Sequence, residues 1–277
     1  MTQSLLDQYC VFGNPIEHSR SPFIHHAFAE QTGQGIDYQK QLVAVDQFPE
    51  AVASFIKKSG KGANVTVPFK EVALTLADEL SDRAALAGAV NTLTFKNGKI
   101  FGDNTDGEGL VQDLIRNKVT LTNSRILILG AGGAAKGVIL PLLAQEPQLI
   151  TIANRTVSKA EQLKLNFADE RLVACGYSDV ENKKFDLIIN ATSASLSGNL
   201  PDISPQIIGK NVICYDMVYG KDETPFLKWA KNLGAEKTID GLGMLVSQAA
   251  VSFYIWRGLT PETSEVILNL RSSLKAE

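Results

Sequence analysis

The sequence predicts an α/β protein of two domains, each built on a mainly parallel sheet. Short apolar runs alternate with helix-length amphipathic segments along most of the chain, which is the pattern of strands joined by crossover helices. One strand runs directly into the glycine-rich turn Gly130–Gly133. The length of 277 residues exceeds the usual size of one domain, and 44% hydrophobic residues allow a full core in each.

The first hundred residues predict three strands, two helices and a hairpin. In chain order we expect a strand at Tyr9–Gly13, a helix at Pro22–Thr32, a strand at Asp37–Val45, a helix at Gln47–Ser59, a strand at Gly62–Val67 and a hairpin over Asn91–Asn104. Ser21 is expected to cap the first helix, and Gly60 to end the second. The hairpin is expected because Asn97-Gly98 is a preferred two-residue turn.

A helix at Asp106–Asn117 is expected to lead into a second alternating series. Its expected strands are Arg125–Leu129, Leu149–Ala153, Phe185–Asn190, Val212–Met217 and Glu236–Ile239. Its expected helices are Ala134–Gln145, Val157–Phe167, Pro225–Leu233, Leu242–Trp256 and Pro261–Ser272. This order predicts a second parallel sheet, with the domain boundary near Asp106.

Composition and charge argue against several classes of protein. The formal net charge is −3 with scattered lysines and arginines, so no nucleic-acid partner is expected. The apolar runs are too short to span a membrane, and Met1–Asp7 lacks the features of a signal peptide. Three cysteines and three histidines lack the spacing of metal ligands. We therefore expect a cytoplasmic, metal-free protein with reduced thiols, either a monomer or a homodimer.

The block from Arg125 to Gly137 indicates a dinucleotide site. The strand Arg125–Leu129 is followed at once by Gly130, which suits a tight turn, and by Gly132 and Gly133, whose backbone can approach a pyrophosphate. Ala135 stands where the third glycine of the fingerprint would be. A glycine-rich loop without a ligand is the alternative, but the strand before it and the helix after it favour the dinucleotide.

The end of the next strand indicates which dinucleotide binds. An NAD enzyme usually has a carboxylate there for the ribose hydroxyls, whereas this strand is followed by Asn154, Arg155 and Thr156, with Lys159 one turn later. These groups suit a 2′-phosphate, which predicts NADP. The alternative is that Arg155 and Lys159 are solvated residues at a helix start.

Polar residues also gather at the junctions between elements in the first half. They are Ser19, Ser21, Asn64, Thr66, Lys70, Asn91 and Asp106. Singly, each has a structural explanation as a cap, a turn residue or an exposed lysine. Together they supply a proton donor and neutral hydrogen-bonding groups, the set that reduction of a carbonyl requires.

Nine stretches in chain order carry a family resemblance. They are Ser19-x-Ser21, Asn64-Val-Thr-Val-Pro-Phe-Lys70, Gly88-Ala-Val-Asn91-Thr, Asn104-Thr-Asp106-Gly, Gly130-Ala-Gly-Gly-Ala-Ala, Asn154-Arg-Thr156, Asn190-Ala-Thr-Ser193, Met217-Val-Tyr219 and Asp240-Gly-Leu-Gly-Met-Leu-Val-Ser-Gln248. Over essentially its whole length the sequence resembles the shikimate dehydrogenase family. The resemblance implies the reversible NADPH-dependent reduction of 3-dehydroshikimate to shikimate, a step toward aromatic amino acids.

The resemblance also implies domains and site residues. It implies a substrate domain of residues 1–105, completed by 241–277 with a C-terminal helix returning to it, and a Rossmann-type NADP domain of residues 106–240. The residues expected to bind substrate are Ser19, Ser21, Asn64, Thr66, Lys70, Asn91, Asp106, Tyr219 and Gln248. The residues expected to bind NADP are Gly130, Ala131, Gly132, Gly133, Ala134, Asn154, Arg155, Thr156, Lys159, Thr192, Met217, Gly241 and Met244.

By the same resemblance, Lys70 is the catalytic residue and Asp106 its partner. We expect direct hydride transfer, with Lys70 either donating a proton or only stabilising the alkoxide. Three alternatives stay open: a quinate/shikimate dehydrogenase with broader substrate and cofactor use, a methylenetetrahydrofolate dehydrogenase of similar fold, and a non-catalytic NADP-binding sensor. The Ser19-x-Ser21 and Asn104-Thr-Asp106-Gly stretches argue against the second, and intact Lys70 and Asp106 argue against the third.

Overall fold

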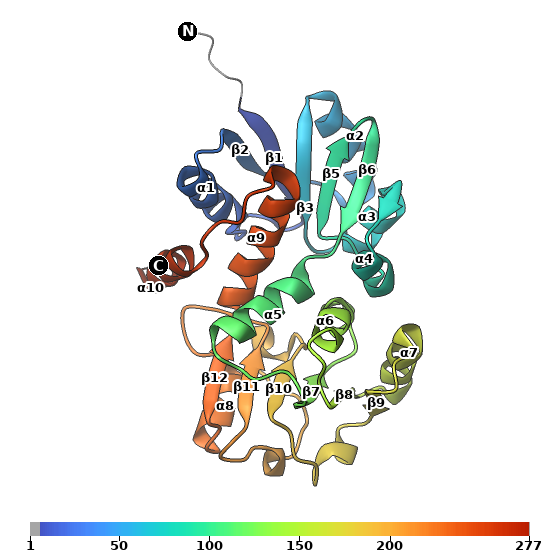
Figure 1. Cartoon of the computed structure of the whole chain (residues 1–277), viewed down its shortest axis with the longest axis vertical. Helices are drawn as coiled ribbons and strands as arrows, with labels where there is room; N and C mark the ends of the chain where they lie inside the picture. The colour runs from blue at the N-terminus through green and yellow to red at the C-terminus, as the bar shows by residue number, and fades with distance from the viewer. Residues whose placement is uncertain (1–5, 277) are drawn as a thin grey trace. The chain divides into compact units, whose positions relative to one another are not determined.

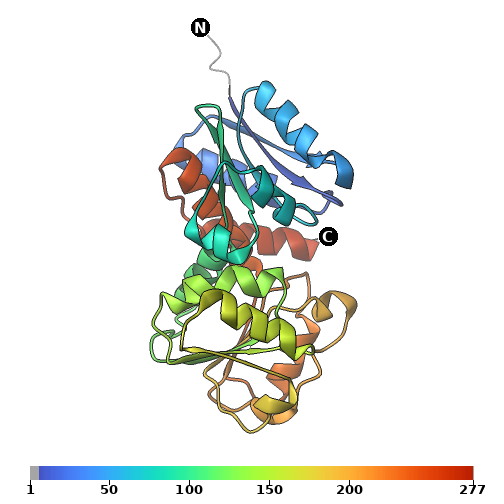
Figure 2. The same ribbon diagram turned by 90° about the vertical axis from the view of Figure 1, so that its right-hand side faces the viewer.

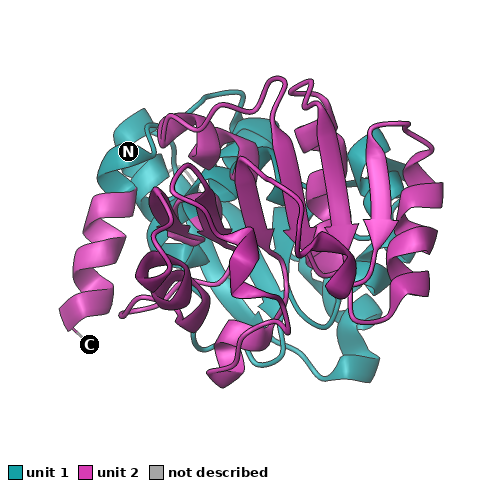
Figure 3. Cartoon of the chain, turned by 90° about the horizontal axis from the view of Figure 1, so that it is seen from below, with its two compact units in different colours: residues 1–109, 246–266 teal, residues 110–245, 267–277 magenta. Residues whose placement is uncertain are grey.

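The computed structural model describes residues 6–276. The chain divides into two compact units (Figure 3): unit 1 holds residues up to 109 together with 246–266, and unit 2 holds residues 110–245 and 267–277. The expected substrate domain, residues 1–105 with 241–277, overlaps unit 1, but unit 1 continues to residue 109 and its C-terminal part is 246–266. Residues 267–277 are grouped with unit 2, where Arg271 donates to the Gly220 carbonyl oxygen at 3.2 Å and to Asp240 Oδ1 at 2.5 Å.

Unit 1 contains a mixed sheet of six strands in the order β2-β1-β3-β5-β6-β4 (Figure 1). The strands are β1 (Asp7–Gly13), β2 (Ile36–Leu42), β3 (Gly60–Val65), β4 (Glu79–Leu80), β5 (Thr92–Lys96) and β6 (Lys99–Asp103). β1 pairs in parallel with β2 and β3, whereas β5 runs antiparallel to β3 and β6. The expected hairpin is confirmed, and Asn97 and Gly98 at its turn both have positive φ, as a two-residue turn of this kind requires.

Helices cover both faces of the unit 1 sheet. They are α1 (Ser21–Thr32), α2 (Phe48–Lys57), α3 (Lys70–Leu76), α4 (Asp82–Ala87) and most of α9 (Leu242–Arg257). One apolar cluster packs the sheet against α2, α3 and α4. On the other face, the edge-to-face rings of Phe28 and Phe253 join α1 to α9. Figure 2 shows α2 and α9 on opposite sides of this sheet.

Unit 2 contains an all-parallel sheet of six strands in the order β12-β11-β10-β7-β8-β9. The strands are β7 (Arg125–Leu129), β8 (Leu149–Ala153), β9 (Leu172–Cys175), β10 (Leu187–Asn190), β11 (Ile213–Asp216) and β12 (Lys237–Asp240). Counted from the first strand of the unit, this is the 3-2-1-4-5-6 order of a Rossmann sheet. The expected α/β class with a Rossmann-type domain is confirmed.

Two separate apolar clusters fill the faces of the unit 2 sheet. The helices of unit 2 are α5 (Asp106–Arg116, mostly in this unit), α6 (Gly133–Leu143), α7 (Val157–Phe167), α8 (Pro225–Asn232) and α10 (Ser264–Ala276). One cluster packs α5, α6 and α7 on the sheet, and the other packs α8 on the opposite face. Figures 1 and 2 show α6 and α7 on the same face. Within residues 6–276, no helix combines the length and apolarity needed to cross a membrane.

Several local predictions differ from the structure. Gly60 does not end α2, because the helix ends at Lys57 with Lys58 as its cap and Gly60 is already the first residue of β3. β9 was not expected, because Leu172–Cys175 is a short strand without a strong alternating pattern. Ser21 is not the N-cap of α1, since the helix already includes it and Arg20 occupies the cap position without a side-chain hydrogen bond. The Ser21 hydroxyl is therefore not used as a cap.

Candidate active site

An ion pair between Lys70 and Asp106 joins the first residues of two helices, α3 and α5. Lys70 begins α3 and Asp106 begins α5, so each side chain projects from the first turn of a helix. The Lys70 Nζ lies 2.5 Å from Asp106 Oδ2, and the two side chains are 30% and 17% exposed. The pair is partly buried but not sealed, so a ligand can reach the ammonium group. The sequence predicted both residues, and the structure brings them together.

Asn91 holds the other oxygen of Asp106. The Asn91 Nδ2 donates to Asp106 Oδ1 at 2.8 Å and to Thr105 Oγ1 at 2.9 Å, while Asn91 Oδ1 accepts from the Thr105 N–H at 2.9 Å. Gln248 Oε1 accepts from Asn91 Nδ2 at 3.4 Å and from Thr105 Oγ1 at 3.3 Å. We call Lys70, Asn91, Thr105, Asp106 and Gln248 the Asn91 cluster. Thr105 is a member that sequence reasoning did not single out.

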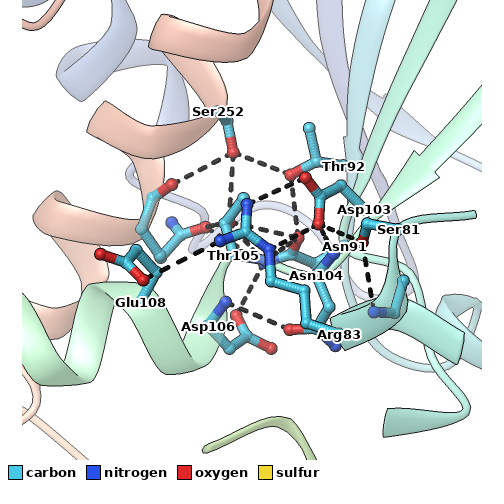
Figure 4. Close-up of polar contacts among 12 residues, drawn as sticks. Ser81, Arg83, Asn91, Thr92, Asp103, Asn104, Thr105, Asp106, Glu108 and Ser252 are labelled. Atoms are coloured by element: carbon cyan, nitrogen blue, oxygen red, sulfur yellow. Dashed lines mark hydrogen bonds and ion pairs between the residues drawn. The ribbon is translucent and has the colours of Figure 1, made fainter. Parts of the chain in front are cut away.

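A second ion pair supports the loop that carries the Asn91 cluster (Figure 4). Asp103 ends β6 and accepts from Arg83 Nε at 2.7 Å and from Ser81 Oγ at 2.6 Å. Burial alone would raise the pKa of Asp103, but the hydrogen bonds from Arg83 and Ser81 outweigh it and hold the pKa below its ordinary value. Asp103 Oδ1 also accepts from the Asn104 N–H at 2.7 Å. This pair fixes the strand end from which Thr105 and Asp106 follow, and the sequence did not predict it.

Asn64 is buried and connects three elements of unit 1. Its Oδ1 accepts from the Tyr38 hydroxyl at 2.7 Å and lies 3.1 Å from His25 Nε2. Its Nδ2 donates to the Asn91 carbonyl oxygen at 3.2 Å and to Ser252 Oγ at 3.1 Å. Burial lowers the pKa of His25 to about 3, so its imidazole is neutral and its Nε2 donates to Asn64. Both amide atoms of the expected substrate residue Asn64 thus have protein partners in this structure.

Two of the expected substrate-binding residues, Ser19 and Ser21, lie side by side. Ser19 Oγ donates to Ser21 Oγ at 3.3 Å, and Ser21 is buried while Ser19 is half-buried. Ser21 also hydrogen-bonds the Tyr38 hydroxyl, which links it to Asn64. Thr66, half-buried, follows β3 and donates its N–H to the Phe12 carbonyl oxygen at 2.9 Å. Tyr219, the remaining expected substrate residue, belongs to unit 2.

In unit 2, the glycine loop between β7 and α6 has the form that a pyrophosphate requires. Gly130 has φ +106°, which L side chains rarely adopt, so glycine is needed there. A Cβ built at Gly132 or Gly133 would meet no atom within 4 Å, so the space in front of both is open. Gly132 caps α6 without any side-chain hydrogen bond, which leaves the first turn of the helix to a ligand. Ala131 is buried and Ala134 exposed beside them.

The segment between β8 and α7 presents positive charge. Arg155, Thr156 and Lys159 are all exposed, and the Asn154 side chain donates to the Thr156 carbonyl oxygen at 2.8 Å. Within the described part of the chain, no carboxylate forms an ion pair with Arg155. These residues follow β8, and the glycine loop follows the neighbouring strand β7. Together they fit an anionic dinucleotide that carries an extra phosphate.

The other expected cofactor residues follow β10, β11 and β12. Thr192 donates through both its N–H, at 3.1 Å, and its hydroxyl, at 2.7 Å, to Asn190 Oδ1. A Cβ at Gly241 would lie 2.2 Å from the Met217 carbonyl oxygen, so only glycine fits there. Met244 is buried in the apolar cluster beneath α5 and α6, so its side chain packs in the core. Met217 is half-buried.

Asp216 is a buried carboxylate that sequence reasoning missed. It ends β11, is 0% exposed, and accepts from Ser195 Oγ and Thr224 Oγ1, both at 2.6 Å, and from Asn190 Nδ2 at 3.2 Å. Burial raises the pKa of Asp216 in spite of these hydrogen bonds. We call Asn190, Thr192, Ser195, Asp216 and Thr224 the Asp216 cluster. The signal in the sequence was an aspartate closing an otherwise apolar strand.

Within residues 6–276, no group of three or more histidine, cysteine or carboxylate side chains is arranged to hold a metal ion. The chemistry available on the described residues is that of an ammonium, a carboxylate and neutral hydrogen-bonding groups in unit 1. Unit 2 supplies a glycine loop and a cationic segment. The groups of unit 1 suit a small polar ligand, and those of unit 2 suit a dinucleotide.

Comparison with known families gives matches along most of the chain. The model of the shikimate dehydrogenase substrate binding domain matches residues 11–93. The model of shikimate/quinate 5-dehydrogenase matches residues 113–197, and that of the shikimate 5′-dehydrogenase C-terminal domain matches residues 241–267. The matched stretches include the glycine loop, Lys70, and Gln248.

Individual proteins resemble the chain over nearly its full length. The shikimate dehydrogenase (NADP(+)) of Colwellia psychrerythraea is 70% identical over 275 residues, covering 99% of this chain and 100% of the relative. The crystal structure of an Ael1 enzyme from Pseudomonas putida has a TM-score of 0.93 at 43% identity, covering 95% and 98%. Shikimate 5-dehydrogenase from Thermus thermophilus, solved with NADP(H) and shikimate, has a TM-score of 0.88 at 30% identity, covering 97% and 100%.

Proposed function

The chain belongs to the shikimate dehydrogenase family, and we propose that it catalyses the reversible NADPH-dependent reduction of 3-dehydroshikimate to shikimate. The observation that carries this proposal is the partly exposed Lys70–Asp106 pair, held by Asn91. An ammonium and a carboxylate 2.5 Å apart suit a substrate that presents a ketone beside a hydroxyl group. The reaction places the enzyme in the shikimate pathway of aromatic amino acid biosynthesis.

Lys70 acts on the oxygen of the ketone in this proposal. As hydride adds to the carbonyl carbon, negative charge develops on the oxygen, and an ammonium donor stabilises it mainly in the transition state. Asp106 keeps the Lys70 Nζ in place and accepts a hydrogen bond from the neighbouring hydroxyl. Asn91 fixes the rotamer of Asp106 through the 2.8 Å bond to Oδ1. No covalent intermediate with the protein is required.

Substrate and cofactor are held by different residues of the chain. We assign the substrate carboxylate to Ser19, Ser21 and Tyr219, and the ring hydroxyls to the polar residues of unit 1. These are Asn64, Thr66, Asn91, Asp106 and Gln248. When bound, NADPH supplies the hydride. The open glycine loop suits the pyrophosphate, and Arg155, Thr156 and Lys159 suit the 2′-phosphate that distinguishes NADP from NAD.

Steady-state kinetics with four substrate pairs tests the proposed function. Initial rates are measured with shikimate and with quinate, each with NADP and with NAD. We expect the highest kcat/KM for shikimate with NADP. A higher kcat/KM with quinate would replace the proposal with the broader quinate/shikimate dehydrogenase. Stoichiometric NADPH binding without turnover of either acid would replace it with a non-catalytic sensor.

We further propose that the enzyme works in the cytoplasm, as a monomer or a homodimer. The support for the location is the state of the cysteines: Cys10, Cys175 and Cys214 are buried free thiols. Burial raises the pKa of the Cys214 thiol to about 12 and the pKa of Cys10 well above its ordinary value, so both stay protonated and unreactive. Reduced thiols of this kind are typical of a reducing compartment.

A further inference from the structure

We infer that Asp216 is a positioning residue, which orders the two loops that carry cofactor-binding residues after β10 and β11. The inference rests on the proposed function, because it concerns the NADP site of that enzyme. Asp216 is outside the set of residues expected to touch NADP, and no catalytic step uses it. It lies at the carboxyl end of a parallel strand, the edge at which α/β sheets bind their ligands.

The loop after β10 is held through Asn190. Asn190 ends β10, is 0% exposed, and donates its Nδ2 to Asp216 Oδ1 at 3.2 Å. This bond determines which end of the Asn190 amide is the acceptor, because a carboxylate can only accept. Asn190 Oδ1 is therefore turned toward Thr192 and accepts from its N–H and its hydroxyl. Ser195, in the same loop, donates directly to Asp216 Oδ2 at 2.6 Å.

The loop after β11 is held to Asp216 by a hydrogen bond from the loop's own backbone. The Val218 N–H donates to Asp216 Oδ1 at 3.1 Å, between the expected ligands Met217 and Tyr219. The Val218 carbonyl oxygen in turn accepts from the Gly241 N–H at 3.2 Å. Thr224 adds a third segment, since its hydroxyl donates to Asp216 Oδ2 at 2.6 Å and accepts from the Leu227 N–H at the start of α8.

The glycine loop depends on the same network. A Cβ at Gly130 would lie 3.1 Å from Thr192 Cγ2, so the Thr192 side chain packs directly against the turn that follows β7. A shift of Thr192 would therefore alter the surface on which the pyrophosphate rests. A buried charge with only neutral partners is costly, which suggests that Asp216 is kept for the geometry that it imposes rather than for stability.

The substitution Asp216→Asn tests the inference, because it keeps the size of the side chain and adds an NH₂ group facing donors. We expect the Kd of NADPH, measured by calorimetry on the folded full-length protein, to rise about tenfold or more. The KM for shikimate should change less than this Kd. Calorimetry requires no turnover, so NADPH binding is tested even if shikimate proves not to be the substrate.

A matched control separates positioning from general stability. Asp113→Asn changes another carboxylate of unit 2 that is 0% exposed, one that accepts from Tyr215 at 2.8 Å and from Asn117 at 3.0 Å and, unlike Asp216, forms an ion pair with an arginine, Arg116. It should lower the melting temperature while leaving the Kd of NADPH near wild type. If Asp216→Asn does not fold, Ser195→Ala can replace it, because it removes only one hydrogen-bond donor to Asp216. It should also raise the Kd of NADPH. A folded Asp216→Asn protein with the wild-type Kd, or equal weakening by Asp113→Asn, would overturn the inference.

Discussion

The Asn91 cluster of unit 1 and the Asp216 cluster of unit 2 each hold a carboxylate, but with different partners. Asp106 pairs with the Lys70 ammonium and is 17% exposed. Asp216 is 0% exposed, and its hydrogen-bond donors are two hydroxyls, an amide and a backbone N–H. One carboxylate is therefore part of a charge pair that a ligand can reach, and the other is a charge sealed among neutral groups.

The difference indicates how each charge is used. A partly exposed ammonium and carboxylate can exchange partners with a substrate, because water and ligand compete for the same hydrogen bonds. A sealed carboxylate cannot do so, but it accepts several donors from segments distant in the chain and fixes them together. We therefore expect substitutions in the Asn91 cluster to affect the chemical step, and those in the Asp216 cluster to affect cofactor affinity.

Among these substitutions, Lys70→Ala should have the largest effect on activity. It is the most direct test of the expectation that the Asn91 cluster affects the chemical step. It removes the donor proposed to face the developing alkoxide, so kcat should fall by about 10²–10⁴-fold while the KM for shikimate changes little. Initial rates over a range of shikimate concentrations at saturating NADP give both constants. A raised KM at unchanged kcat would make Lys70 a binding residue only.

The chain offers a matched control for Lys70. Lys99 in unit 1 also pairs with a carboxylate, Glu79, at 2.6 Å, but the two side chains are 57% and 51% exposed. Lys99→Ala removes the same kind of group outside the Asn91 cluster and should leave kcat and KM at wild-type values. A loss of kcat in Lys99→Ala comparable to that in Lys70→Ala would point to a general effect of charge.

The sequence predicted most of the fold because its signals were local. The strand–glycine–helix block at Gly130 and the Asn97-Gly98 turn specify their own backbone geometry, and both are confirmed. Short strands such as Leu172–Cys175 were missed, since four residues carry little periodicity and are defined by pairing with β8. The mixed direction of the unit 1 sheet likewise depends on long-range pairing.

The site residues divide in the same way. Lys70 and Asp106 could be predicted because they stand at helix starts within recognisable motifs. Arg83, Thr105 and Asp216 could not, because their roles arise from partners that the fold brings together, such as Asp103 for Arg83 and Ser195 for Asp216. Asn64 was expected to contact the substrate, and its hydrogen bonds to buried neighbours could not be read from its position in the chain.

Arg155→Ala tests the cationic segment of unit 2 and should have an intermediate effect. If Arg155 binds the 2′-phosphate, its removal deletes a charge-assisted contact that NAD never makes, and the preference for NADP over NAD should shrink about tenfold. Thr156 and Lys159 remain, so the preference should not vanish. The wild-type preference should also narrow as salt rises, because the segment is exposed.

The measurement is KM for both cofactors at two salt concentrations, in wild type and in Arg155→Ala. Lys164→Ala is the control, because Lys164 is an exposed cation near the C-terminal end of α7, away from the turn that carries Arg155. It should leave the NADP-to-NAD ratio unchanged. An unchanged ratio in Arg155→Ala as well would show that the 2′-phosphate is recognised elsewhere.

The smallest expected effect is on the pH dependence of stability. Asp103 and Asp216 should contribute to it with opposite signs. The pKa of Asp103 is lowered, because the hydrogen bonds from Arg83 and Ser81 outweigh burial, so its contribution to stability is present above the unfolded pKa of about 3.9 and is lost as pH falls through the lower folded pKa. The pKa of Asp216 is raised by burial, so the ionised form disfavours folding. Stability from Asp216 is therefore greatest below the unfolded pKa and declines as pH rises through the folded value.

Asp103→Asn and Asp216→Asn should therefore show opposite trends against wild type between pH 3 and pH 7. The melting temperature deficit of Asp103→Asn should shrink as pH falls, by about 2–4 °C for each kcal/mol of lost contribution. The deficit of Asp216→Asn should instead grow as pH falls, because the wild-type carboxyl becomes neutral and is no longer penalised by burial. Differential scanning calorimetry across this pH range measures both deficits. Parallel trends in the two variants would mean that Asp103 and Asp216 do not differ in the way that their partners suggest.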